Sequence, residues 1–178
     1  ITEIYDFLRL LYAKVSIAYS HVSGKPMIKL TEEEIVQNIL NKHKGQKIAI
    51  LAPLVSGRKG HYRELFESYT KKGFLEMYID GEFVKMSPKM QLDRYKIHTI
   101  DLVLDKLSVK TDNETRIIED IRKAIKESEG TVIIYDLDAE QSFYYSKHLL
   151  DSDNGISYPE PSANTFSFNS NFGACETC

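Results

Sequence analysis

The feature that most constrains the fold is an almost continuous apolar run over Lys47–Val55. A strand that is apolar at consecutive positions is buried on both of its faces, so it belongs in the middle of a sheet. Thr131–Leu137 is a second buried strand of this kind. His98–Val109 instead alternates, which predicts a long strand whose wetter face includes Asp101 and Asp105. The chain is therefore expected to fold around a sheet.

Helical segments alternate with these strands. Thr31–Glu34 has the spacing of a capping box and opens a helix, and Thr111–Glu114 repeats the pattern. A further helix is predicted over His61–Lys72, where Gly73 at the following position ends it. Asp80-Gly81 is the sequence of a tight type I′ hairpin turn between two short strands.

Residues 31–140 are thus predicted to form an α+β domain, a mixed sheet with helices packed on it. The flank 1–30 opens with a helix over Thr2–Val15 that is apolar nearly all round. Such a helix is normally buried on all sides, and part of its cover is expected to be missing from this chain. The flank 141–178 becomes polar over 151–173, where isolated aromatic residues need another surface to lie on. Since domain termini often lie close together, we expect the flanks to meet, with the compact unit inserted in a larger domain of a longer protein.

The composition argues against several classes of protein. A formal net charge of -3 argues against a dedicated nucleic-acid-binding module, whose pI usually exceeds about 9. Two cysteines in 178 residues cannot make a disulfide scaffold, which favours a reducing compartment, the cytoplasm. No apolar run approaches the ~18 residues of a membrane span, so no membrane partner is expected.

No catalytic residue is predicted. The loop Ser56–Gly60 follows a strand and precedes a helix, as a phosphate loop does, but Lys59 precedes the last glycine instead of following it. A solvated basic turn is the preferred interpretation, and the five histidines are dispersed without metal-binding spacing. Asp136, Asp138 and Glu140 at a strand end suit a hard cation or, more commonly, an acidic turn. This chain by itself is therefore not expected to be an enzyme.

A basic stretch precedes the long strand. Its cations are Lys85, Lys89, Arg94 and Lys96, and Tyr95 lies among them. This composition suits contact with DNA phosphates or, equally, a solvated loop. Other basic residues extend the same positive face and suit electrostatic steering of an acidic protein partner. They are Arg58, Lys59, Arg63, Lys71, Lys72 and Lys106.

The two cysteines, Cys175 and Cys178, have the C-x-x-C spacing of half a tetrahedral zinc site. Such a site needs four ligands, and the chain has no other cysteine. The remaining ligands are expected downstream of this chain rather than elsewhere within it. The half site is therefore expected to be empty in this fragment.

Three blocks of the sequence closely resemble the UvrA family of bacterial nucleotide-excision-repair ATPases. They are Thr2–Leu11, Leu51–Gly60 and Phe166–Ser170, the last leading to Gly173-Ala174-Cys175. The resemblance runs end to end and implies a dimeric ABC-type ATPase that finds damaged DNA and loads UvrB. This stretch resembles the UvrB-interaction domain and the adjoining parts of the signature domain. ATP and zinc are then expected cofactors of the whole protein, with none for the fragment, and DNA is contacted through the whole protein.

Two cysteine pairs of many relatives are replaced in this sequence. One pair corresponds to Ser20-His21-Val22-Ser23 and the other to Asp151-Ser152-Asp153-Asn154. We hypothesise that the two pairs share one zinc ion in those relatives and that this protein lacks it. The alternative is that Asp151 and His21 or His148 substitute as ligands, which is uncommon for structural zinc.

The UvrB-facing surface of relatives carries basic residues at two positions, which correspond here to Glu76 and Lys106. Lys106 keeps the positive charge, and Glu76 reverses it. The leading hypothesis is a UvrB-docking domain in which Lys106, Glu76 and Tyr78 contact UvrB from a polar, charge-bearing face of the sheet. The alternative is a DNA-contacting accessory domain that uses the basic segment 85–98.

Overall fold

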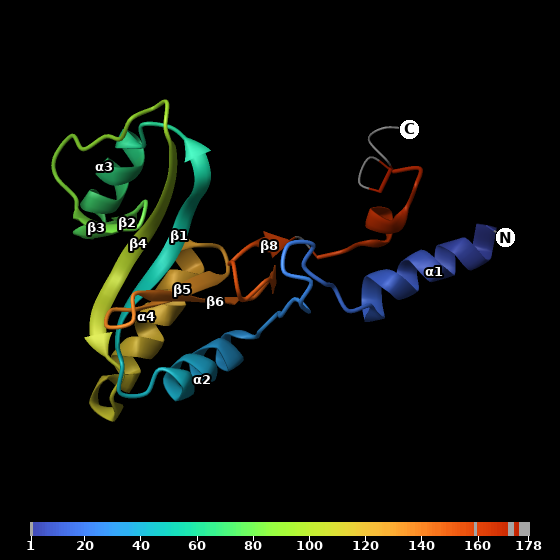
Figure 1. Cartoon of the computed structure of the whole chain (residues 1–178), viewed down its shortest axis with the longest axis horizontal. Coiled ribbons are helices and arrows are strands. Elements are labelled where there is room, and N and C mark those ends of the chain that lie inside the picture. Colours follow the sequence, from blue (N-terminus) through green and yellow to red (C-terminus); the bar gives the residue numbers. More distant parts are fainter. Residues whose placement is uncertain (1, 159, 171–172, 175–178) are drawn as a thin grey trace. The chain divides into compact units, whose positions relative to one another are not determined.

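The computed structural model describes residues 2–158, 160–170 and 173–174. These residues fall into two compact units (Figure 1), which are described separately. The sheet unit runs from Leu30 to Lys147, and the flanking unit combines the residues up to Lys29 with those from His148 onward.

The sheet unit is built on one six-stranded sheet. Its strands, in spatial order, are β3 (Glu82–Lys85), β2 (Glu76–Ile79), β4 (Ile97–Ser108), β1 (Lys47–Lys59), β5 (Thr131–Asp136) and β6 (Gln141–Ser146). The α+β class is confirmed, but the sheet is not mixed, because every pair of neighbouring strands is antiparallel. Short turns join β2 to β3 and β5 to β6, and a parallel pair needs a longer crossover. The last strand, β6, extends the sheet past the boundary expected at residue 140.

Strand β1 is longer than the sequence predicts. The expected loop Ser56–Gly60 is mostly strand, because Arg58 and Lys59 pair with His98 and Ile97 of β4 beyond a register shift that follows Val55. Together β1 and β4 form the long bent ribbon of Figure 1. Residues 56–59 are exposed, as the solvated interpretation expects, but they continue β1 through a register shift at Gly57 instead of forming a turn.

The structure confirms the predicted hairpin turn and one of the two predicted capping boxes. Helix α2 (Glu32–Lys42) begins with the predicted capping box at Thr31. Asp80 and Gly81 both have positive φ, 52° and 94°, as a type I′ turn requires. The second capping box is wrong: Thr111–Asn113 forms a short 3-10 turn before α4 (Glu114–Glu127). There the side-chain amide of Asn113 donates to the Ser108 carbonyl at 3.1 Å instead of capping the helix.

The two faces of the sheet differ. Helices α2, α3 (Arg63–Lys71) and α4 pack on one face over a large core that includes Ile50, Phe66 and Ile121. The opposite face carries a smaller apolar cluster, and its members come from strands and a turn. That cluster comprises Ala49, Leu51, Val103 and Ile133, with Tyr78, Phe83, Tyr135, Leu137 and Tyr144 against it. Strand β1 is thus buried on both faces, as predicted, although helices cover only one of them among the described residues.

The flanking unit contains α1 (Thr2–Val15), the short pair β7 (Leu149–Leu150) and β8 (Ser157–Tyr158), and the 3-10 turn η2 (Ala163–Phe166). The aromatic residues of the polar segment do lie on another surface, because Phe168 stacks at 5.2 Å on Tyr5 of α1. Part of the apolar surface of α1 is uncovered among the described residues of this unit, where Phe7 is 74% exposed. Among the described residues, no helix is both long and apolar enough to cross a membrane.

Candidate functional site

The face of the sheet that carries no helix gathers three aromatic rings from three strands. Tyr78 of β2, Phe83 of β3 and Tyr135 of β5 have ring centroids between 4.7 and 5.4 Å apart. The rings meet in the same cluster as the fully buried Ala49. All three are half-buried, so part of each ring remains open to solvent. We call these three residues with Glu76, Asp101 and Lys106 the open face.

Two of the predicted contact residues bind each other. The Lys106 ammonium lies 2.7 Å from the Glu76 carboxylate and 3.7 Å from the centre of the Phe83 ring. The side chains are 33% and 24% exposed, which leaves both partly reachable. Glu76, Lys106 and Tyr78 thus share one surface, as the sequence hypothesis requires. The charge of Glu76, however, is balanced by Lys106 within the domain.

Asp101 is the residue of this face that the sequence misjudges. The alternation of β4 assigns it to a wetter face, yet it is only 5% exposed. Burial raises its pKa to about 7. Burial, and then a hydrogen bond with Tyr135, raise the pKa of Tyr78 to about 12. The Asp101 carboxylate is therefore shielded from water in the folded domain, although the alternating pattern of the strand predicts that it is exposed.

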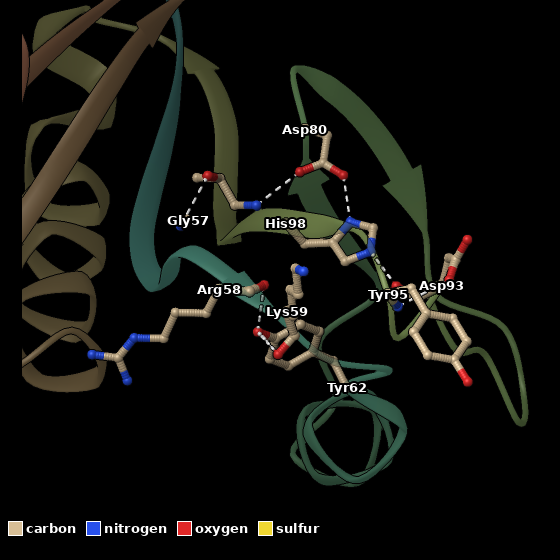
Figure 2. A network of polar contacts seen from close by, with 9 residues as sticks. Gly57, Arg58, Lys59, Tyr62, Asp80, Asp93, Tyr95 and His98 are labelled. Carbon is tan, nitrogen blue, oxygen red and sulfur yellow. Dashed lines mark hydrogen bonds and ion pairs between the residues drawn. The ribbon is translucent and has the colours of Figure 1, made fainter.

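A second polar network lies at the end of the β1–β4 ribbon near α3 (Figure 2). His98 Nδ1 lies 2.6 Å from an Asp80 carboxylate oxygen, and its Nε2 lies 2.9 Å from the Asp93 carbonyl. Two acceptors facing both ring nitrogens favour the protonated ring, so the pKa of His98 is raised by Asp80 first and by Asp93 next. The other Asp80 oxygen accepts from the Thr99 amide at 2.7 Å. The network ties the hairpin turn to the loop before β4.

The predicted basic residues of the segment 85–98 come from different elements. Arg94 and Lys96 lie in the loop just before β4, where Tyr95 is 70% exposed. Lys85 instead lies on β3 opposite Glu76, at the end of the hairpin away from its turn. Lys89 lies in the connecting loop and has a positive φ of 64°.

The positions of the replaced cysteine pairs meet in the flanking unit. The Ser23 hydroxyl donates to Asp151 at 2.7 Å, and the Asn154 amide donates to the same carboxylate oxygen at 2.8 Å. Hydroxyl bonds from Ser20 and then Ser23 lower the pKa of Asp151 to about 2. His21 is engaged with the Tyr158 hydroxyl at 2.7 Å.

The hydroxyl, carboxylate and amide side chains of Ser20, Ser23, Asp151 and Asn154 do not fit a structural zinc ion, which takes cysteine and histidine ligands. Within residues 2–158, 160–170 and 173–174 there is no group of three or more His, Cys, Asp or Glu side chains placed to hold a metal. The predicted half site, Cys175 and Cys178, lies outside the described residues.

The fold and the open face define a class of protein. One face of the sheet is filled by helices, and the other offers aromatic rings beside an ion pair. This is the architecture of an accessory interaction domain.

The chain belongs to the UvrA interaction domain family, whose model matches residues 31–138. It is similar to UvrABC system protein A of Aquifex aeolicus, at 39% identity over 178 residues. It is also similar to the proteins of that name from Halalkalibacterium halodurans and Bacillus subtilis, at 39% and 38% identity. Each match covers 100% of this chain and 18 to 19% of the relative. The chain thus spans about a fifth of the length of these relatives.

Proposed function

We propose that the sheet unit is a docking domain that binds UvrB in bacterial nucleotide excision repair and that the open face is its contact surface. In this proposal ATP, zinc and damaged DNA are ligands of a whole, dimeric UvrA-type ATPase. The domain contributes binding and no chemical step. Membership of the UvrA interaction domain family supports a docking role.

The observation that carries the proposal is the aromatic cluster of Tyr78, Phe83 and Tyr135 beside the Glu76–Lys106 pair. Tyrosine and other aromatic residues are enriched in protein interfaces, where they supply large contact area from few rotatable bonds. A half-exposed charged pair at the edge of such a cluster selects the partner by charge. The face therefore combines a centre that supplies binding free energy with a rim that supplies specificity.

Exchanging Lys106 for glutamate tests this proposal. The change places a second carboxylate beside Glu76 and removes the cation that an acidic UvrB surface would meet. We expect UvrB binding to weaken by about 1–3 kcal/mol, or about 5- to 150-fold in Kd. Titration calorimetry of the chain with UvrB from the same organism measures it.

Lys110→Glu is the matched control, because it makes the same charge change at an exposed residue that lies beyond the last pair of the β1–β4 ladder, Lys47 with Ser108, and is not part of the open face. We expect it to leave UvrB affinity unchanged. A similar loss in both variants would mean that the domain senses net charge and that Lys106 makes no specific contact. Thermal unfolding of each variant checks that the fold is retained.

We further propose that the hydrogen-bonded group of Ser20, Ser23, Asp151 and Asn154 holds its two turns together without zinc. The carboxylate accepts bonds from both turns, so it joins them as a shared metal ion does in a zinc site. Elemental analysis of purified chain carrying Cys175→Ser and Cys178→Ser is expected to find no bound zinc. One tightly held zinc per chain in that background would contradict the proposal and favour Asp151 with His21 or His148 as ligands.

A further inference from the structure

The tip of the β1–β4 ribbon gathers cations from two segments that are far apart in the sequence. Lys59 pairs with Ile97 in the ladder, and the Leu92 amide donates to the His61 carbonyl at 2.9 Å. These contacts hold residues 58–61 against residues 92–97. Four exposed cations are thereby brought to one end of the β1–β4 ribbon. We call them the tip cations: Arg58, Lys59, Arg94 and Lys96.

The tip cations differ from other basic residues of the sheet unit in whether they form ion pairs. Arg63 pairs with Glu67, Lys72 with Glu127 and Lys106 with Glu76, so these three charges are largely compensated. Within the described part of the chain the tip cations make no ion pair.

Two carboxylates of the network in Figure 2, Asp80 and Asp93, have partners of their own. Asp80 binds His98 and the Thr99 amide, and Asp93 accepts from the Tyr95 amide at 3.0 Å. Protonation of His98 would add a further positive charge beside them. The domain therefore has a local excess of positive charge at the tip, although the whole chain has a net charge of -3.

An aromatic side chain lies among these cations. Tyr95 is 70% exposed, and the Arg94 guanidinium lies 4.6 Å from the centre of its ring. Figure 2 shows Tyr95 beside the Asp93 and His98 network, with Arg58 and Lys59 on the neighbouring strand. An exposed ring between cations can stack on a base or pack on a sugar while the cations meet phosphates.

We propose that the tip binds the phosphate backbone of DNA, independently of the open face and of its protein partner. Lysine is depleted in the cores of protein interfaces, whereas Lys and Arg provide most protein contacts to phosphate. Uncompensated cations beside one exposed ring therefore favour a nucleic acid over an acidic protein. Because the contacts are to phosphate, binding is independent of base sequence and steeply dependent on salt.

Fluorescence anisotropy of a labelled duplex of about 25 base pairs tests the proposal with the whole chain, at NaCl concentrations between about 50 and 200 mM. The test variant is Lys59→Ala with Lys96→Ala. Its matched control is Lys44→Ala with Lys110→Ala, two exposed lysines at the other end of the ribbon that likewise make no ion pair within the described residues. Both variants lose the same charge.

The wild-type chain is expected to bind weakly and to lose affinity steeply with salt. The tip variant is expected to bind about ten-fold more weakly at the lowest salt, with a salt slope smaller by about 2, because each lost phosphate contact removes about 0.9. The control variant should match wild type. Arg58→Gln with Arg94→Gln is a second tip variant that tests the same surface, and circular dichroism checks the fold of each.

Three outcomes would overturn the proposal. They are an equal loss in tip and control variants, a salt slope that the tip variants leave unchanged, and displacement of the duplex by poly-glutamate as readily as by unlabelled DNA. The last outcome would mean that the tip binds acidic protein. UvrB binding by the tip variants is expected to be normal, so failure of this proposal and failure of the docking proposal can be told apart.

Discussion

Replacing Asp101 by asparagine is expected to stabilise the domain at pH 8 by about 2–4 kcal/mol and to leave it nearly unchanged at pH 4. The folded pKa of Asp101 is about 7, against an ordinary value of 3.8, because burial disfavours its charged form. Between these two pKa values the Asp101 carboxyl group therefore keeps its proton in the folded state and has lost it in the unfolded state. Stability is lost as pH rises through this window, and the full shift corresponds to about 4 kcal/mol. Asparagine carries no charge, so it avoids this loss.

Urea unfolding of wild type and Asp101→Asn at pH 4, 6 and 8 measures the difference in the free energy of unfolding. Asp112→Asn is the control, because it removes a carboxylate at an exposed position. Its effect should stay within about 0.5 kcal/mol at every pH. A difference between wild type and Asp101→Asn that is the same at all three pH values would show that the buried carboxylate does not titrate as described.

Truncating Phe83 and Tyr135 together to alanine is expected to weaken UvrB binding by about 2–4 kcal/mol, or about 30- to 1000-fold in Kd. The two rings supply aromatic area to the open face from β3 and β5. Removing them uncovers the apolar cluster around Ala49 and leaves Lys106 without the ring on which it lies. Surface plasmon resonance with immobilised UvrB measures the change.

Tyr95→Ala is the matched control for this variant, because it removes an exposed ring from the same unit at the tip. The docking proposal expects normal UvrB affinity for this control. If Phe83→Ala with Tyr135→Ala remains folded and binds UvrB as wild type does, the open face is not the contact surface. The double variant also loses packing on Ala49 and Leu51, so its melting temperature should fall moderately while unfolding stays cooperative.

Much of the fold is readable from local sequence, since local chemistry decides it. The capping box at Thr31 and the Asp80-Gly81 turn form because the interacting groups are a few residues apart. The apolar run of β1 correctly identifies a strand buried on both faces. The same reasoning fails at Ser56–Gly60, because extension of β1 depends on pairing with β4, which is distant in the chain.

The candidate site is only partly readable in this way. The resemblance to UvrA selects Glu76 and Lys106, Tyr78 is added from the same strand as Glu76, and the structure places the three on one surface. The resemblance gives no sign that Glu76 and Lys106 neutralise each other. Nor does any sequence signal single out Phe83 and Tyr135 as neighbours of Tyr78, since their strands meet only in the assembled sheet.

The sequence by itself determined most of the elements and the α+β class, because periodicity, caps and turn residues act over a few positions. The family followed from the resemblance of its sequence to UvrA. Only the tertiary structure decided the antiparallel order of the strands, the burial of Asp101 and which cations remain uncompensated at the tip. These properties depend on strand register, which brings residues far apart in the chain within contact distance. The free energy of a charge is set by those contacts and by the water they exclude.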